Sequence, residues 1–117
     1  MALQRLVHKR DFESVLSQRP SRWTPHFALH VLQPVAKPFG VGVVLPKRWA
    51  KRAVTRNGIR RQIYAVAAQA LRARPGCAMV VRQRAAFSQD DFPSAWSRPL
   101  KRQVRNELQQ LLSGCAA

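Results

Sequence analysis

The sequence predicts an α+β fold in which a βαβ unit and further helices pack on an open sheet. Short continuous apolar runs at residues 41–45 and 77–81 are typical of buried strands. Between them, residues 53–73 have the length and alanine content of a long helix, which Pro75 and Gly76 end. A long helix between two buried strands is the pattern of a βαβ unit.

The segments before this unit predict one helix and one strand. Residues 7–18 predict a helix because apolar side chains recur there at rough helical spacing, namely Val7, Phe12, Val15 and Leu16. Residues 19–25 contain two prolines and predict a loop or an irregular edge strand. In residues 26–33, alternate side chains would project from opposite faces of a strand, and both of these faces would be largely apolar. We therefore expect a strand that is covered on both faces.

The C-terminal part predicts two more helices. The pattern becomes helical from Phe92, and two prolines favour a short helix followed by a second one that begins near Pro99, where proline is tolerated. The second helix has one apolar stripe, formed by Leu100, Val104, Leu108 and Leu111. With 117 residues, 46% of them hydrophobic, residues 1–117 are expected to form a single domain.

Charge is distributed unevenly along the chain. There are 21 Lys and Arg residues against 5 Asp and Glu, a formal net charge of +16. Residues 14–89 contain 14 basic residues and no carboxylate. Since such a charge destabilises a lone compact fold, we expect a polyanionic partner, and the predominance of arginine favours phosphate and base contacts in RNA.

The sequence favours a cytoplasmic location. It has no run of about 18 apolar residues that could span a membrane. Residues 1–7 are too short and polar for a secretory signal. Cys77 and Cys115 form no CxxC pair, and two thiols fit a reducing compartment.

The densest basic segment spans residues 46–61. On a helical wheel from Ala53, an apolar arc that includes Ile59 and Ile63 lies beside a polar arc of arginines and one asparagine. Four more cations precede this helix, whose N-terminal N–H groups attract phosphate. A merely solvated face would have acids interspersed, and none occurs here. The predicted RNA-binding residues are Lys47, Arg48, Lys51, Arg52, Arg56, Asn57, Arg60 and Arg61.

Unpaired bases stack on aromatic side chains, so aromatic residues are further candidates for RNA contacts. Most aromatic residues of a small domain belong to its core, however. The candidates are Phe12, Trp23, Phe27, Trp49, Tyr64 and Trp96.

We find no catalytic residues and no metal site in the sequence. Metal-dependent phosphodiester hydrolysis uses clustered carboxylates, which residues 14–89 lack. The acidic pairs near residues 11–13 and 90–91 fit helix starts better. His26 and His30 lie about 13 Å apart on one strand, too far to hold one phosphate or metal. No glycine-rich phosphate loop occurs either, so we expect no small-molecule substrate.

Together these segments resemble the protein subunit of bacterial ribonuclease P over nearly the whole chain. The similarity begins with the first helix and the strands at residues 27–32 and 40–45, and continues in the strand at residues 75–84. It is strongest in the basic signature, which here reads Lys47-Arg48, Arg52-Ala53 and Arg56-Asn57-Gly58-Ile59-Arg60-Arg61. Gly58 departs from the pattern, because the family usually has an arginine there.

The resemblance implies a small α/β sandwich with a mostly antiparallel four-stranded sheet and a left-handed βαβ crossover. It implies that the RNA subunit is the ribozyme and holds the catalytic Mg²⁺, so that the protein itself holds no cofactor. The protein binds that RNA and the 5′ leader of precursor tRNA. The leader groove lies between the first helix and the open sheet face, and the matching positions are Phe12, Leu16, Phe27 and His30.

Two other classes remain open on the residues alone. A structural RNA-binding protein of ribosomal type would have the same composition. A DNA-binding module could use the long basic helix, but no helix-turn-helix spacing supports it.

Overall fold

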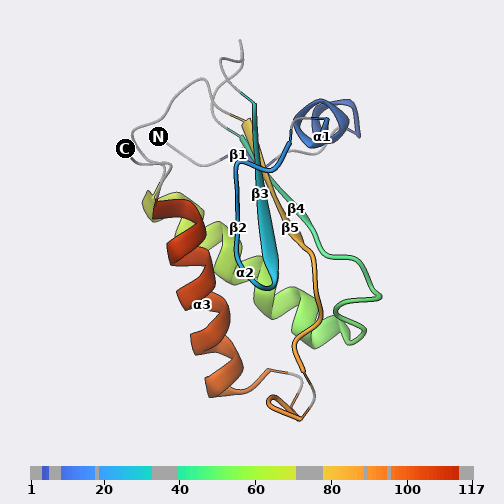
Figure 1. Ribbon diagram of the computed structural model, residues 1–117, viewed down its shortest axis with the longest axis vertical. Helices are drawn as coiled ribbons and strands as arrows, with labels where there is room; N and C mark the ends of the chain where they lie inside the picture. Colours follow the sequence, from blue (N-terminus) through green and yellow to red (C-terminus); the bar gives the residue numbers. More distant parts are fainter. Residues whose placement is uncertain are drawn as a thin grey trace.

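The computed structural model describes residues 4–5, 9–17, 19–32, 40–70, 78–88, 90–94 and 96–113. A sheet separates two helical layers (Figure 1). Helices α2 (Ala53–Ala70) and α3 (Arg98–Ser113) lie side by side on one face, and α1 (Lys9–Leu16) lies on the other. The predicted α+β sandwich is therefore confirmed. None of the described helices combines the length and the apolar character needed to cross a membrane.

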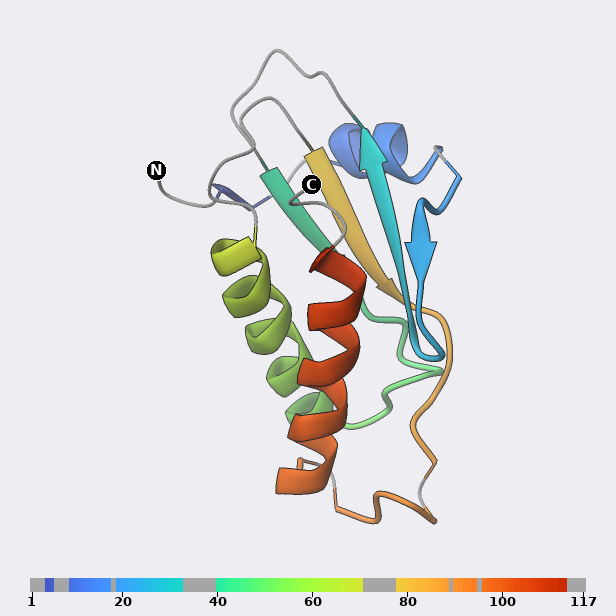
Figure 2. The same ribbon diagram turned by 60° about the vertical axis from the view of Figure 1, so that its left-hand side comes forward.

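The sheet has the strand order β1-β4-β5-β3-β2 (Figure 2). Its strands are β1 (Gln4–Arg5), β2 (Arg22–Trp23), β3 (Phe27–Leu32), β4 (Gly40–Val44) and β5 (Ala78–Gln83). Strands β4 and β5 are parallel neighbours joined through α2, which confirms the predicted βαβ unit. Strand β3 is antiparallel to both β5 and β2, whereas β1 is parallel to β4.

Two details of the expected sheet need correction. It has five strands rather than four, because the two-residue strand β1 extends the edge beside β4. At the other edge, β2 lies within residues 19–25, where an irregular edge strand was one of the two predictions. Parallel and antiparallel pairings are equally frequent, so the sheet is mixed rather than mostly antiparallel. The shortness of β2 follows from Pro20 and Pro25, which flank it and cannot donate ladder hydrogen bonds.

The short helix predicted from Phe92 is wrong for the residues that the structure describes there, 90–94 and 96–97. Asp90, Asp91 and Trp96 lie in turns, and none of these described residues is helical. Phe92 instead packs edge-on against Phe87, with the ring centroids 5.8 Å apart. The second helix begins as predicted, and the Ser97 hydroxyl accepts a hydrogen bond from the Leu100 N–H at its start.

The main core lies between the sheet and the helices α2 and α3. The apolar stripe predicted for α3 is buried, as are Ile59, Ile63 and Val66 of α2. From β3, Phe27 and Leu29 belong to the same cluster and have no exposed surface. On the other face of the sheet, Val15 of α1 is buried. The strand is thus covered on both faces, as its alternation predicts.

Candidate nucleic-acid interface

The loop between β4 and α2 carries four of the predicted RNA-binding cations: Lys47, Arg48, Lys51 and Arg52 are all exposed. We call residues 46–52 the basic loop. Its shape is fixed by backbone bonds from the N–H groups of Trp49 and Ala50 to the Pro46 carbonyl, at 3.0 and 3.2 Å. The loop lies at the end of the molecule where both α2 and α3 begin (Figures 1 and 2).

Arg56 ties the basic loop to the first turn of α2. Its Nη1 atom donates to the carbonyl oxygens of Ala50 and Lys51, each at 2.8 Å. A guanidinium has five N–H donors, so these two bonds leave a cationic group that can still meet a phosphate. Arg56 therefore fixes the backbone that presents Lys51 and Arg52, in addition to contributing its own charge.

The exposed face of α2 agrees with the predicted wheel. Asn57 and Arg61 are exposed, whereas Arg56 and Arg60 are half-buried. The Arg60 Nη1 atom donates to the Asn57 side-chain oxygen at 3.2 Å. The eight predicted residues thus form one continuous basic stretch over the loop and the first turns of α2, with the N-terminal N–H groups of the helix at its centre.

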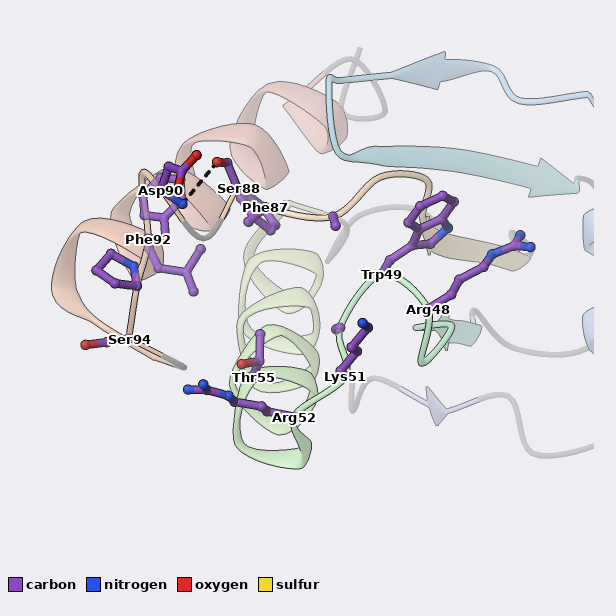
Figure 3. A pocket seen from close by; sticks show the side chains of 14 residues that line it. Arg48, Trp49, Lys51, Arg52, Thr55, Phe87, Ser88, Asp90, Phe92 and Ser94 are labelled. Carbon is purple, nitrogen blue, oxygen red and sulfur yellow. Dashed lines mark hydrogen bonds between the residues drawn. The ribbon is translucent and has the colours of Figure 1, made fainter.

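A pocket of about 650 Å³ opens beside the basic loop (Figure 3). Arg48, Lys51 and Arg52 line one side of it, and the connection from β5 to α3, with Phe87 and Phe92, lines the other. The Arg48 guanidinium lies 5.0 Å from the centre of the Trp49 ring, a cation–π contact. The Trp49 carbonyl in turn accepts a 3.3 Å hydrogen bond from Gln83, which joins the loop to β5.

The Trp96 indole packs on Gly58, the residue at which the basic signature departs from the family pattern. A Cβ built on Gly58 would lie 2.4 Å from Cε2 of the Trp96 indole. The ammonium of Lys101 lies 6.0 Å from the centre of the same ring. The glycine is thus required by the indole packed on it. Sequence reasoning missed this pair because residues 38 positions apart carry no local pattern.

The α1 side of the sheet holds the second predicted site. Because side chains alternate along a strand, His30 faces α1, whereas Phe27 faces α2 and α3. Arg82 is the cross-strand partner of Ala28 and lies on the same face as His30, with its Nε 3.4 Å from His30 Nε2. The sequence analysis did not select Arg82.

The four predicted groove residues have different positions. Leu16 lies half-buried on α1, and His30 is buried on the sheet beneath that helix layer. Phe12 belongs to α1, and its side chain is outside the described set. Phe27 is wrong as a groove residue, because it has no exposed surface and belongs to the core on the opposite face.

His26 is part of a buried polar cluster rather than of the groove. Its Nδ1 lies 2.7 Å from one oxygen of Glu107, and its backbone N–H donates to the other at 3.0 Å. Burial alone would raise the pKa of Glu107, but hydrogen bonds from Gln103, Thr24 and His26 together hold it below its ordinary value. The cluster links the turn before β3 to α3. No group of three or more potential metal ligands occurs among the residues described.

Comparison with known proteins agrees with this combination of an α+β sandwich and a basic loop at the start of its crossover helix. The Ribonuclease P family model matches residues 1–113. The ribonuclease P protein component of Burkholderia pseudomallei is 35% identical over 116 residues, which cover 96% of this chain and 82% of the relative. That of Ralstonia pickettii is 37% identical over 107 residues, which cover 92% and 75%.

Solved structures show the same fold. The Staphylococcus aureus RNase P protein superposes with a TM-score of 0.71 at 18% identity, covering 95% of this chain and 94% of that one. The Thermotoga maritima protein gives 0.68 at 20% identity, covering 95% and 96%. The chain belongs to the ribonuclease P protein family.

Proposed function

We propose that this chain is the protein component of ribonuclease P in the cytoplasm, where it binds the catalytic RNA subunit through the basic loop and the first turns of α2. The observation that carries the proposal is the pair of hydrogen bonds from Arg56 to the carbonyls of Ala50 and Lys51. They fix the backbone that carries the exposed cations before RNA arrives, which lowers the ordering cost of binding. A solvated charged face would not need such an anchor.

The second part of the proposal concerns the substrate. The groove between α1 and the sheet takes the 5′ leader of precursor tRNA, using Phe12 and Leu16 from the helix and His30 and Arg82 from the sheet. Arg82 supplies a cation for the phosphates, and its Nε is held by His30. Phe27 has no part in it, because it is a core residue of the other face.

Under this proposal catalysis belongs to the RNA subunit, whose Mg²⁺ would activate water and stabilise the leaving oxygen. The protein positions the precursor and neutralises phosphates close to the cut. The result is endonucleolytic removal of the leader and a mature tRNA 5′ end.

Reconstitution tests this function. Ribonuclease P RNA at low magnesium should cleave precursor tRNA only when this protein is added, and the protein alone should cleave nothing. A protein that binds the RNA without restoring cleavage would be a structural RNA binder of ribosomal type. Leader removal by RNA-free protein would overturn the assignment of catalysis to the RNA.

A further inference from the structure

Trp23 is an exposed aromatic side chain at the edge of the sheet. It is 66% exposed, although tryptophan is on average one of the more buried residues of folded proteins. Val54, on α2, is the other large hydrophobic residue with a comparable exposure among the described residues. An exposed indole contributes little to the core, so its position on the molecule is informative.

Strand register places Trp23 on the groove face. Trp23 is the cross-strand partner of Ala28, and Ala28 is the partner of Arg82. Directly opposed residues project from the same face of a sheet, so these three form one row across β2, β3 and β5. His30 and Val80 form the next row on that face. The row with Trp23 continues the α1 face of the sheet to its outer edge, which is formed by β2.

The backbone that carries Trp23 is held on both sides. The Ser21 N–H donates to the Leu29 carbonyl, and the Thr24 N–H donates to the Phe27 carbonyl, both at 2.8 Å. The Thr24 hydroxyl accepts a hydrogen bond from the Phe27 N–H at 3.2 Å. The turn after Trp23 is further fixed through His26 and Glu107. The indole therefore projects from a rigid edge, which lowers the entropy lost when it binds a ligand.

Two cations accompany the indole. Arg84 donates through Nη1 to the Thr24 carbonyl at 3.0 Å, which holds a guanidinium next to the turn that follows Trp23. Arg82 lies in the same row two strands away, a distance of about 10 Å. An aromatic ring with cations nearby is the arrangement by which proteins bind single-stranded nucleic acid, with stacked bases and neutralised phosphates.

We propose that Trp23 stacks on an unpaired base of the precursor-tRNA leader, and that Arg84 and Arg82 contact the neighbouring phosphates. This inference rests on the leader-binding function proposed above and extends it to a nucleotide at the outer edge of the sheet, beyond α1. Charge complementarity favours single-stranded RNA over an apolar protein segment as the occupant, since no carboxylate occurs within residues 14–89.

The test uses holoenzyme reconstituted with ribonuclease P RNA and a series of precursors whose leaders lengthen one nucleotide at a time. Trp23→Ala should leave the affinity for mature tRNA and for the shortest leaders unchanged. It should lower the affinity for long leaders by on the order of tenfold, the effect of losing one stacked base. Trp23→Phe, which keeps an aromatic face, should retain most of that affinity.

Two controls separate stacking from other effects. Gln109→Ala truncates an exposed side chain of α3, on the opposite face of the sheet, and should change nothing along the series. A 2-aminopurine placed at successive leader positions should lose fluorescence on binding at one position, and Trp23→Ala should abolish that loss. Sedimentation of wild type and Trp23→Ala tests a second copy of the chain as the occupant, and a dimer that the substitution dissolves would contradict the proposal.

The possible failures are distinguishable. If wild type prefers precursor to mature tRNA but Trp23→Ala matches it at every leader length, the stacking inference is wrong and leader binding stands. An equal loss of affinity for mature tRNA would also refute it. If wild type shows no preference for leader-bearing RNA, the proposed leader function itself fails.

Discussion

Gly58 and Trp96 fit together so closely that a single methyl group at residue 58 would lie 2.4 Å from Cε2 of the indole. The contact joins α2 to the segment that leads into α3, and both parts belong to the end of the molecule that carries the basic loop. A glycine in the middle of a helix costs about 1 kcal/mol relative to alanine. The indole packed on this position offsets that cost.

This contact predicts a reversal of sign in a double-mutant cycle. Gly58→Ala alone should lower the free energy of unfolding by about 1 kcal/mol, because overpacking outweighs the gain in helix propensity. In a Trp96→Ala background the same substitution should stabilise the protein by up to about 1 kcal/mol. Urea unfolding of the four variants measures both values. Equal effects of Gly58→Ala in the two backgrounds would contradict the contact.

An arginine at residue 58, the residue that the family usually has there, should meet the same indole. Gly58→Arg should destabilise the wild-type protein, since the larger side chain meets the same indole. Gly58→Arg with Trp96→Ala should fold and should bind ribonuclease P RNA with a salt dependence steeper by about one unit than Trp96→Ala alone, because one more phosphate is neutralised. Filter binding over a range of salt concentrations measures the slope.

Substitutions at Arg56 and Arg61 should separate the contribution of positive charge to RNA binding from the contribution of the loop geometry that Arg56 fixes. Wild type should show a salt slope on the order of −4 if about five phosphates are neutralised. Arg61→Ala removes an exposed cation and should flatten that slope by about one unit. Arg56→Lys keeps the charge but cannot reproduce both bonds to the Ala50 and Lys51 carbonyls. It should therefore weaken binding with little change in slope, whereas the matched variant Arg61→Lys should bind nearly as wild type.

The Glu107 cluster predicts a loss of stability in acid. A carboxyl whose pKa is lower in the folded protein than in the unfolded chain stabilises the fold fully at pH values above its unfolded-state pKa. This stabilisation is lost as the pH falls through the folded-state pKa. The ordinary value is 4.5, so the loss should begin near that pH and continue below it. Glu107→Ala leaves buried donors of His26 and Gln103 without their acceptor and should cost about 3 kcal/mol at neutral pH.

Asp91→Asn provides the control for this experiment, because Asp91 is exposed. It should leave both the stability and its acid dependence close to wild type. Chemical unfolding at a series of pH values measures the effect. An unchanged acid dependence in Glu107→Gln would show that another group is responsible.

Patterns within one element predicted most of the fold. The apolar stripe of α3, the two faces of α2 and the βαβ unit all follow from the spacing of residues on a single helix or strand. The two-residue strand β1 does not, because it is defined by its neighbour β4 rather than by its own residues, whereas β2 lies within residues 19–25, where an edge strand was one of the two predictions. The missing helix at Phe92 has the same cause: a contact with Phe87 decided the conformation.

In the candidate site, too, features that depend on neighbouring residues in the sequence could be predicted, and features that depend on distant residues could not. The basic loop was predicted because its cations are consecutive in the chain, but the anchoring role of Arg56 depends on carbonyls that only the folded loop brings near. Arg82 joins His30 through strand pairing across 52 residues, and no local pattern indicates it. Phe27 and His30 both match family groove positions, but the alternation of faces along β3 puts only His30 on the α1 side, and Phe27 lies in the core.

The two phenylalanines of the predicted groove provide the last test. Phe27 is a core residue, so Phe27→Ala should lower the free energy of unfolding by about 3–5 kcal/mol and weaken binding of all RNAs alike. Phe12 lies on α1, and as a groove residue it would stack on a leader base, worth about 1–3 kcal/mol. Phe12→Ala should therefore lower the affinity of the holoenzyme for precursor tRNA much more than for mature tRNA. Melting curves and binding of both RNAs measure the two effects, and a Phe12→Ala variant that resembles Phe27→Ala in both would place Phe12 in the core.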